Sequence, residues 1–545
     1  MNTRRILLSI TLLPAVLAAQ GLNPAALLKP ATDSWPTYNG DYSGRRFSTL
    51  SQINASNVHN LSLAWVYRAT AGPATGAIIG GEGPAAAQGG AAATIKATPL
   101  MVNGVLYFST PDNAWAVDAR TGKQLWHYFW RTRGGIHIGS RGFGMWGNWL
   151  FFETPDNYLV SLDARTGQER WHVEIADVKQ EYFSTPSPVI VGNHVIVGTG
   201  GDSLDVPGFL EARDPETGAV QWKWWSAPLK KGDPGSESWP DEYSMRHGGG
   251  MTWIPGTYDP ELRLYYLGTG NPNPVMAGQS RKGDNLWTCS IVALDVDTGK
   301  LVWYFQPSPH DTHDWDTVQT PVLIDGVFNG QPRKMLAQAA RNGYFFLLDR
   351  TNGKNLLTAS FLPALNWAKG LDAKGQPIGN PDKDPKTDGT LVSPASGGAS
   401  NWPPPSFNPE TGLFYVSSTR SWSLYYLTDT DDHPEGYGGR DSGLFSKSYL
   451  IAIDYKTGKI AWEHEWPSRS GLSGLLSTAG KLLFSGDGAQ NLVALDPAKG
   501  KILWHAGLTS EVSNGPITYT LDGKQYLVVG AGDSLYAFTM NQRVQ

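Results

Sequence analysis

The sequence predicts an all-β fold, an eight-bladed β-propeller, because one short unit recurs along almost the whole chain. In each copy an apolar run ends at an Asp, a turn with Gly follows, and a Trp stands eight residues after the Asp. Asp and Thr side chains bond local amides in such turns and Gly accepts a positive φ, so each copy is typical of a β-hairpin. The copies are Asp118/Trp126, Asp163/Trp171, Asp214/Trp222, Asp295/Trp303, Asp454/Trp462 and Asp496/Trp504, and a seventh runs from Asp349 to Leu357 in the Trp position.

Strands outside the hairpins complete the units. Two further strand-like runs precede several hairpins, as between Thr98 and Phe108, which gives roughly four short strands per unit, the composition of a propeller blade. Each Trp is then placed to dock against the neighbouring blade. At the chain ends, residues 534–538 match the apolar run and residues 61–67 match the Trp strand, so the N- and C-terminal strands are expected to pair and close the ring as an eighth blade.

Residues 1–20 are interpreted as a signal peptide, since Arg4 and Arg5 precede an apolar run that is too short to span a bilayer. Residues 21–545 are expected to form a single propeller domain without a transmembrane segment, in a periplasmic or secreted protein. The lone cysteine, Cys289, excludes an intramolecular disulfide and a C-x-x-C-H haem site. The net charge of −5, with no basic stripe, argues against nucleic acid as a partner.

Three polar segments are candidates for chemistry, and each also has a plainer interpretation. Trp253 follows the triple glycine 248–250, so it offers a flat face beside a backbone that can approach a ligand, or it is one more packed tryptophan. Asn271 carries an amide oxygen suited to a hard cation, or it forms an Asn-Pro turn. Asp314 and Asp316 alternate on one side of a short extended segment and suit a calcium-like ion, or they are hydrated surface carboxylates.

Taken together, these segments resemble the quinoprotein alcohol dehydrogenases, the methanol and ethanol dehydrogenases that use pyrroloquinoline quinone (PQQ). The resemblance runs from about Trp35 to the C-terminus and includes the opening run WPTYNGDYSGRRFS. It implies an eight-bladed propeller with PQQ on its axis beside a calcium or lanthanide ion. It also implies a carboxylate that takes the proton of the substrate hydroxyl while hydride passes to the quinone.

The resemblance assigns roles position by position. Asp314 falls on the catalytic base, and Arg341 falls near the quinone oxygens. The metal ligands that it implies are Asn271, Asp314 and, as in lanthanide-using members, Asp316. The residues that it places around PQQ are the stacking platform Trp253, the polar-edge contacts Arg141, Thr154 and Asn401, and Lys96.

Four positions depart from the family pattern. A calcium or lanthanide ion gains affinity through its carboxylate count, so Asp202 or Asp205 would have to compensate for a lost glutamate ligand. Lys96, although it replaces a glutamate that bonds the cofactor, is able to pair with a carboxylate of PQQ and so preserve binding. The departures are Gly135-Ile136 in place of adjacent cysteines, Ser203 in place of the metal-binding glutamate, Lys96, and Leu472 in place of a tryptophan over the pocket.

The sequence leaves two functions open. The first is an exported quinoprotein that oxidises an alcohol or related CH–OH substrate and, lacking a haem motif, passes electrons to a soluble cytochrome. The second is a cofactor-less propeller of quinoprotein descent that acts as a binding or scaffold protein, because fold does not guarantee function. The retained aspartate pair, Trp253 and Arg341 favour the enzyme. A lipid-anchored outer-membrane assembly propeller is disfavoured because no cysteine follows the signal region.

Overall fold

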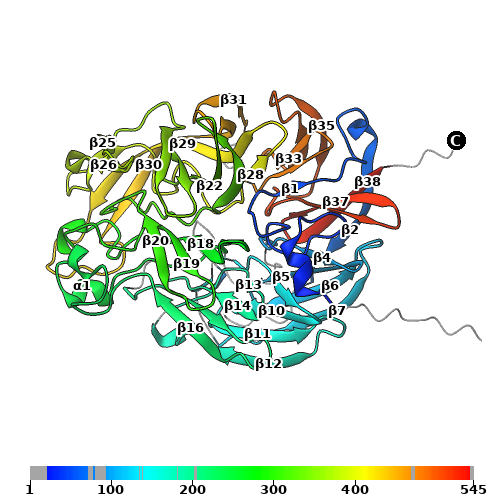
Figure 1. Cartoon of the computed structure of the whole chain (residues 1–545), viewed down its shortest axis with the longest axis horizontal. Coiled ribbons are helices and arrows are strands. Elements are labelled where there is room, and N and C mark those ends of the chain that lie inside the picture. The colour runs from blue at the N-terminus through cyan, green and yellow to red at the C-terminus, as the bar shows by residue number, and fades with distance from the viewer. Residues whose placement is uncertain are drawn as a thin grey trace, which may run out of the picture.

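The computed structural model describes residues 21–70, 94–133, 139–180, 182–201, 205–467 and 473–540, with the backbone of 78–79 and 136–137. Within these ranges the regular structure is almost entirely β, and eight sheets of four or five strands follow one another around a ring in chain order (Figure 1). The arrangement is that of a β-propeller, as the repeat predicted. The predicted signal peptide, residues 1–20, lies outside the described residues.

The first four sheets are each built from four consecutive antiparallel strands. The first holds β4 (Leu100–Val102), β5 (Val105–Thr110), β6 (Asn113–Asp118) and β7 (Gln124–Phe129). The second holds β9 (Gly144–Trp146), β10 (Trp149–Glu153), β11 (Tyr158–Asp163) and β12 (Glu169–Glu174). The third holds β13 (Val189–Val191), β14 (His194–Val197), β15 (Phe209–Arg213) and β16 (Val220–Trp225). The fourth holds β17 (Thr257–Asp259), β18 (Leu264–Gly268), β19 (Ile291–Asp295) and β20 (Leu301–Phe305).

The other four sheets follow the same plan with additions. The fifth holds β21 (Val322–Phe328), β22 (Gln331–Ala339), β23 (Tyr344–Asp349) and β24 (Asn355–Ser360). The sixth holds β27 (Thr390–Val392), β28 (Ser406–Asn408), β29 (Leu413–Leu427), β30 (Gly439–Asp454) and β31 (Ile460–Glu465). The seventh holds β32 (Leu476–Thr478), β33 (Leu482–Gly486), β34 (Asn491–Leu495) and β35 (Ile502–Gly507), with β1 (Phe47–Ser48) parallel to β32.

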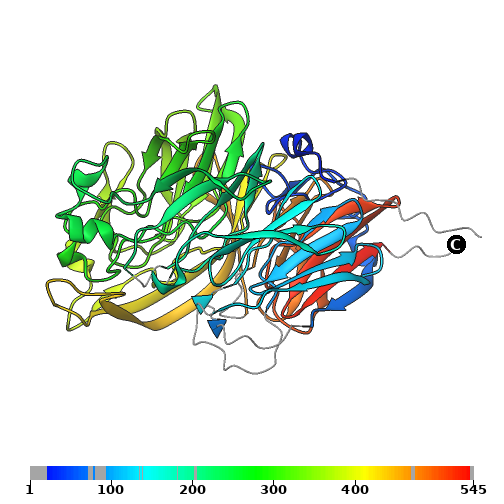
Figure 2. The same cartoon turned by 90° about the horizontal axis from the view of Figure 1, so that it is seen from below.

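The eighth sheet joins the two ends of the chain. Its strands β36 (Ile517–Leu521), β37 (Lys524–Ala531) and β38 (Ser534–Met540) come from the C-terminus. The fourth strand, β2 (Leu61–Arg68), comes from the N-terminal part and pairs antiparallel with β38. Figure 2 shows this pairing as a blue strand beside the red ones.

Little regular structure lies outside these sheets in the described residues. A hairpin of β25 (Ala368–Leu371) and β26 (Pro377–Gly379) decorates one insertion, and β3 (Ile78–Ile79) pairs parallel with β8 (Ile136–His137). The α-helix α1 (Glu242–Arg246) is a single short element, and no described helix is long and apolar enough to cross a bilayer. Short 3₁₀ helices span Pro24–Leu28, Val58–Asn60, Val178–Gln180, Ser236–Ser238, Gly278–Ser280 and Pro381–Lys383.

One repeated tryptophan contact links neighbouring sheets. The indole Nε1 of Trp222 in β16 donates a 2.8 Å hydrogen bond to the carbonyl of Val296, just after β19 of the next sheet. Gly299 in the turn that follows has φ +68°, and a Cβ there would lie 2.4 Å from the Trp222 ring. Glycine is therefore needed both for the backbone conformation and for the close approach of the indole. The same bond joins Trp65 to Ala119, Trp126 to Ala164, Trp303 to Arg350 and Trp462 to Pro497.

The segment 35–48 is hydrogen-bonded to five of the eight sheets. Arg46 in this segment donates to the carbonyls of Tyr38, Leu475 and Pro516 at 2.6, 2.8 and 2.7 Å. It has no exposed surface, and burial lowers the pKa of its guanidinium to about 10. The opening run that carried part of the resemblance is thus a structural segment that fastens the sheets together. Backbone hydrogen bonds join this segment to the first, fourth, fifth, sixth and seventh sheets, at Met101, Tyr258, Leu323, Phe407 and Ser477 respectively.

Candidate functional site

The segment that carries Asp314 and Asp316 lies between β20 and β21. A third carboxylate, that of Asp311, accepts hydrogen bonds from its backbone and so fixes its turn. Asp311 Oδ2 accepts hydrogen bonds from the backbone N–H of Trp315 at 3.0 Å and of His313 at 3.4 Å. Burial raises the pKa of the Asp311 carboxyl. Asp311 therefore holds the turn that carries Asp314 and Asp316. The sequence alone did not distinguish this structural role from the roles of the other two aspartates.

Arg341, between β22 and β23, joins the two aspartates. Its Nη2 lies 3.3 Å from Asp314 Oδ2, and its Nη1 lies 3.3 Å from Asp316 Oδ2. All three side chains are buried, and Nη2 also donates to the carbonyl of Ser396 at 2.9 Å. Burial raises the pKa of the Asp316 carboxyl, and the positive charge of Arg341 opposes that shift. The structure thus brings the predicted base, the predicted additional carboxylate and the predicted arginine into one ion-pair network.

Two further segments hold Asp316. The Trp253 Nε1 donates a 2.6 Å hydrogen bond to Asp316 Oδ2, and the backbone N–H of Asn271 donates a 2.7 Å bond to Asp316 Oδ1. The Asn271 side-chain nitrogen donates to the Pro272 carbonyl at 3.2 Å and to Asn273 Oδ1 at 3.3 Å. Its Oδ1 is buried and has no hydrogen-bond partner among the described residues, so this oxygen is the atom of Asn271 that is available to a ligand.

The triple glycine does not open space for a ligand. Gly250 donates its backbone N–H to the carbonyl of Asn271 at 2.8 Å, and Gly248 accepts from the N–H of Asn273 at 3.2 Å. Gly249 has φ +72°, and a Cβ there would lie 2.6 Å from the Asn271 carbonyl oxygen. The glycines pack against the Asn271 turn and so position it, which corrects the interpretation that they let the backbone approach a cofactor.

Cationic and aromatic side chains gather beside Trp253 and Trp402. The Arg141 guanidinium carbon lies 5.4 Å from the centre of the Trp253 ring and 4.6 Å from that of Trp402. The Lys96 ammonium nitrogen lies 5.8 Å from the same Trp402 ring. All three distances are within the range of cation–π attraction. Trp402 was not predicted as a site residue. The only indication in the sequence is that it directly follows Asn401, which was predicted to contact the cofactor.

Thr154 and Asn401, two predicted cofactor contacts, form hydrogen bonds with residues close to them in the sequence. Thr154 Oγ1 donates to Asp156 Oδ1 at 2.8 Å and accepts the backbone N–H of Tyr158 at 3.0 Å. Asn401 Nδ2 donates to the carbonyl of Gly397 at 2.9 Å, and its Oδ1 accepts the N–H of Trp402 at 2.7 Å. In the described structure no hydrogen bond joins Thr154 or Asn401 to the aspartate pair.

Three of the departures from the family pattern fall outside the described residues, namely Gly135, Ser203 and Leu472, and only the backbone of Ile136 is described. Asp202, which was expected to compensate for the lost glutamate, also lies outside the described residues. Asp205 is described, and its Oδ2 accepts the N–H of Gly436 at 2.7 Å. One of its oxygens therefore fastens the acidic loop 428–436 to the neighbouring surface.

The described oxygen donors suit a metal ion only in part. Calcium takes about six to eight oxygen ligands. Asn271 Oδ1 and the Asp314 carboxylate are candidate donors, whereas both oxygens of Asp316 accept protein hydrogen bonds. Over the described residues, no group of three or more His, Cys, Asp or Glu side chains is arranged to hold a metal. A planar anionic quinone fits better, because indole faces and cationic side chains lie together.

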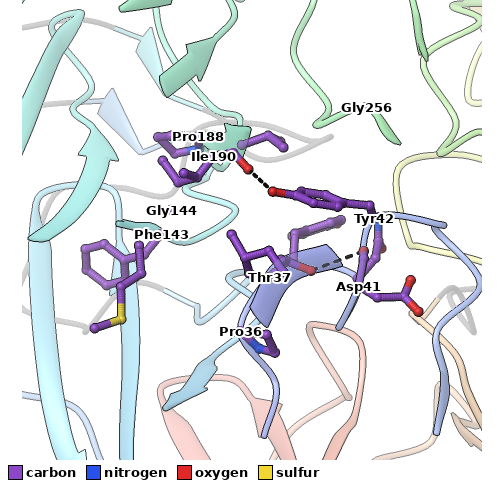
Figure 3. Close-up of a pocket in the computed structure, with 14 residues that line it drawn as sticks. Pro36, Thr37, Asp41, Tyr42, Phe143, Gly144, Pro188, Ile190 and Gly256 are labelled. Atoms are coloured by element: carbon purple, nitrogen blue, oxygen red, sulfur yellow. Dashed lines mark hydrogen bonds between the residues drawn. The ribbon is translucent and has the colours of Figure 1, made fainter. Parts of the chain in front are cut away.

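A small pocket near the segment 35–48 is separate from this site (Figure 3). Its volume of about 20 Å³ is room for one water. Tyr42 lines it and donates its hydroxyl to the carbonyl of Ile190 at 2.6 Å. None of the predicted site residues lines it.

Comparison with known protein families gives two matches. Residues 35–365 match the family described as glucose/ethanol/alcohol dehydrogenase, beta-propeller domain, and residues 446–544 match outer membrane protein assembly factor BamB. The quinohemoprotein alcohol dehydrogenase of Comamonas testosteroni is 35% identical over 549 residues, covering 92% of this chain and 73% of that protein. The quinoprotein alcohol dehydrogenase PedH of Pseudomonas putida is 33% identical over 570 residues, covering 97% and 91%.

Solved structures show the same likeness across almost the whole chain. The crystal structure of the Comamonas testosteroni quinohemoprotein alcohol dehydrogenase superposes with a TM-score of 0.84 at 32% identity, covering 96% of this chain and 82% of that one. A europium-containing methanol dehydrogenase superposes with a TM-score of 0.79 at 29% identity, covering 94% and 99%. The chain therefore belongs to the PQQ-dependent quinoprotein alcohol dehydrogenase family and is an oxidoreductase of the alcohol dehydrogenase type.

Proposed function

We propose that this protein oxidises an alcohol or a related CH–OH substrate with PQQ held at the centre of an eight-bladed propeller. The observation that carries the proposal is the buried network in which Arg341 pairs with Asp314 and Asp316 beside the indole of Trp253. Relatives named quinoprotein and quinohemoprotein alcohol dehydrogenases support the cofactor and the substrate class.

The eight sheets are the blades in this proposal. The pairing of β2 with β38 supports closure of the ring by the two ends of the chain. The repeated bond from a tryptophan to a carbonyl of the next sheet supports docking of blade to blade. A rigid ring suits the site, because its residues come from different blades or their connections and must keep fixed relative positions. These residues are Asn271, Asp314 and Arg341.

Asp314 is the proposed base. It takes the proton of the substrate hydroxyl on a carboxylate oxygen, and Arg341 orients that carboxylate through Nη2 at 3.3 Å. PQQ, when bound, supplies the hydride acceptor. The substrate thus loses a hydride from carbon and a proton from oxygen and leaves as a carbonyl compound. The electron pair passes on to a separate acceptor.

The remaining site residues receive binding roles. Trp253 offers its ring face, and the charges of Arg141 and Lys96 suit the carboxylates of the cofactor. Thr154 and Asn401 stay as proposed contacts at its polar edge. A calcium or lanthanide ion on Asn271, Asp314 and Asp316 also remains a proposal, supported by the europium in one structural relative.

Export and electron transfer complete the proposal. Residues 1–20 support a periplasmic or secreted location for the domain 21–545. A soluble cytochrome is the proposed acceptor, because a chain with one cysteine has no C-x-x-C-H haem site of its own.

A cofactor-less scaffold is the competing function. Burying two carboxylates and a guanidinium costs desolvation that a hydrophobic core of the same volume would avoid. The network around Arg341 is therefore an arrangement that a purely structural hub has no need to keep. Its retention favours the enzyme.

Reconstitution tests the proposal. Purified protein is incubated with PQQ together with calcium, a light lanthanide or EDTA, and alcohol-dependent reduction of an electron-accepting dye is measured. We expect dye reduction that requires both PQQ and an alcohol. Protein that takes up no PQQ with any of these additions would support the scaffold instead.

A further inference from the structure

We infer that Arg281 is a positioning residue for the proposed reaction, because it holds the turn that begins at Asn271 and the turn of Asp314 at a fixed separation. The inference rests on the proposed function, since it concerns where the proposed base stands relative to a proposed metal ligand. Arg281 directly follows the 3₁₀ helix Gly278–Ser280, in the connection between β18 and β19. Asn271 belongs to the same connection.

The guanidinium of Arg281 joins two separate segments through their backbone carbonyls. Its Nε donates to the Pro274 carbonyl at 2.8 Å, and its Nη2 donates to the Val275 carbonyl at 2.7 Å. The same Nη2 donates to the Asp311 carbonyl at 2.6 Å. The first two carbonyls belong to the turn that begins at Asn271, and the third belongs to the aspartate segment. One rigid planar group therefore sets the spacing between the two segments.

Arg281 is itself held firmly in place. It has no exposed surface, and its Nη1 donates to Asn285 Oδ1 at 2.8 Å. The Asn285 Nδ2 donates back to the Arg281 carbonyl at 2.7 Å. Burial lowers the pKa of the guanidinium to about 10, and the negative charge of Asp311 opposes that shift, so the group is charged at neutral pH. A buried charge that has hydrogen-bond partners on all three nitrogens is costly to displace, so it serves as a rigid spacer.

The turn of Asp314 depends on such support. Asp314 has φ +67°, in the left-handed region that residues other than glycine seldom adopt. The Asp311 carboxylate accepts the backbone N–H groups on both sides of it, those of His313 and Trp315. Arg281 therefore acts on Asp314 through Asp311, because its Nη2 holds the carbonyl of the residue whose carboxylate holds the turn. A shift of Asp311 would move the proposed base with it.

A second link joins the same two segments at another point. Cys289 has no exposed surface, its backbone N–H donates to the Gly270 carbonyl at 2.8 Å, and its Sγ donates to the Trp315 carbonyl at 3.4 Å. Loss of the Arg281 contacts is therefore expected to displace the turns while this link keeps the segments together. A displacement of about 1 Å at a reacting group can cost about 10²-fold in rate.

The test compares two buried arginines. Arg281→Lys keeps the charge, but one ammonium group cannot reproduce the planar fork that reaches three carbonyls. Arg46→Lys is the matched control, because Arg46 is also fully buried and also donates to three backbone carbonyls, in a segment outside the site. Both variants are loaded with PQQ and assayed with an alcohol at a temperature where circular dichroism shows them folded. We expect Arg281→Lys to lower kcat about tenfold or more with KM within about threefold, and Arg46→Lys to keep the wild-type kcat.

Hydrogen exchange of the full-length, cofactor-free proteins, followed by mass spectrometry, gives a readout that needs no turnover. Arg281→Lys should raise amide exchange in residues 311–317 about threefold or more, whereas Arg46→Lys should leave that segment at the wild-type rate. Asp311→Ala, which removes the intermediate carboxylate, should raise exchange in the same segment. Asp311→Asn, whose side-chain oxygen can still accept the two N–H groups, should restore most of the protection.

The outcomes separate the inference from the proposed function. A wild-type kcat in Arg281→Lys, or unchanged exchange in residues 311–317, overturns the inference and leaves the proposed function standing. An equal loss of kcat in both arginine variants also overturns it, because the effect would then belong to the fold in general. A wild-type protein without PQQ-dependent turnover overturns both. If Arg281→Lys does not fold, Asp311 decides: the inference requires that Asp311→Ala lose kcat about tenfold and that Asp311→Asn regain most of it, and equal kcat in these two variants overturns it.

Discussion

The indole nitrogen of Trp253 donates a 2.6 Å hydrogen bond to Oδ2 of Asp316, so the proposed stacking platform and the buried carboxylate form one unit. Trp253 is 9% exposed, and Asp316 is 1% exposed. Any movement of the ring is thereby coupled to the network of Arg341 and Asp314. This bond gives the tryptophan a second function beside its flat face.

Substituting Trp253 with Phe separates those two functions. The aromatic face is kept, but the donor to a buried carboxylate is lost. We expect the free energy of unfolding to fall by about 1–3 kcal/mol, the usual cost of leaving a buried acceptor with one donor fewer. Urea unfolding followed by circular dichroism measures it. Unchanged stability would mean that the bond to Asp316 contributes nothing.

Asp314→Asn should abolish turnover and spare binding. The amide keeps the shape of the side chain but cannot accept the substrate proton, so kcat is expected to fall about 10²–10⁴-fold. PQQ binding should be retained within a few-fold, since stacking and the cationic contacts are untouched. Asp388→Asn, which changes an exposed aspartate just before β27, is the control and should have wild-type kcat. A variant with normal kcat would remove Asp314 from the role of base.

The sequence predicted the repeating hairpins well because their cause is local. An Asp and a Gly define each turn, most copies add a Thr, and the spacing to Trp222 or Trp303 places the indole on the outer strand. The contact between Arg341 and the aspartates has no such local cause, since it joins a turn within the fifth sheet to the connection between the fourth and fifth sheets. Only the resemblance to a known family pointed to it, and composition and spacing carried no sign of it.

Other parts of the site were beyond sequence reasoning for the same reason. Trp402 lies between β27 and β28, far in sequence from Arg141 and Lys96, which it contacts. Nothing in the run NWPPP indicates that contact. The triple glycine predicts a close approach of the backbone to a ligand, because glycine permits close approach by any group. The group that approaches Gly249 is the backbone of Asn271, which only the fold specifies.

Stability should fall on mild acidification through His313. Burial lowers the pKa of its imidazole to about 4, from an ordinary value of 6.5. Between these pH values the unfolded chain binds a proton that the folded chain does not, so this residue lowers the free energy of unfolding by up to about 3 kcal/mol as pH falls from 6.5 to 4. Asp384 beside it acts in the opposite sense, because burial raises the pKa of its carboxyl.

The variant His313→Gln isolates that contribution. It removes the titrating ring, so the slope of unfolding free energy against pH should become flatter between pH 4 and 6.5, as measured by urea unfolding at several pH values. Above pH 7 both proteins should show slopes of equal size. Identical slopes below pH 6.5 would show that the folded protein protonates His313 as readily as the unfolded chain does.

Gly299→Ala tests the tryptophan contact between sheets. The added Cβ would lie 2.4 Å from the Trp222 ring at a residue with φ +68°, so both a clash and backbone strain are expected. Gly330→Ala is the matched control, because it has φ +75° but no atom within 4 Å. Strain alone costs about 1–2 kcal/mol, so Gly330→Ala should lose that amount and Gly299→Ala at least about 1 kcal/mol more. Equal losses would mean that the indole moves aside at no cost.

Arg46→Ala should be the most damaging of these changes for the fold. The guanidinium donates to three backbone carbonyls, two of them in or beside different sheets, and has no exposed surface. Its removal leaves three buried acceptors without these donors and a cavity, for an expected loss of about 3–5 kcal/mol in the free energy of unfolding. Arg46→Lys keeps the charge but reaches fewer carbonyls with one ammonium group, so it should recover only part of that loss. Thermal and urea unfolding measure both variants. Full recovery by lysine would mean that charge, and not the three-way hydrogen bonding, holds the segment 35–48 in place.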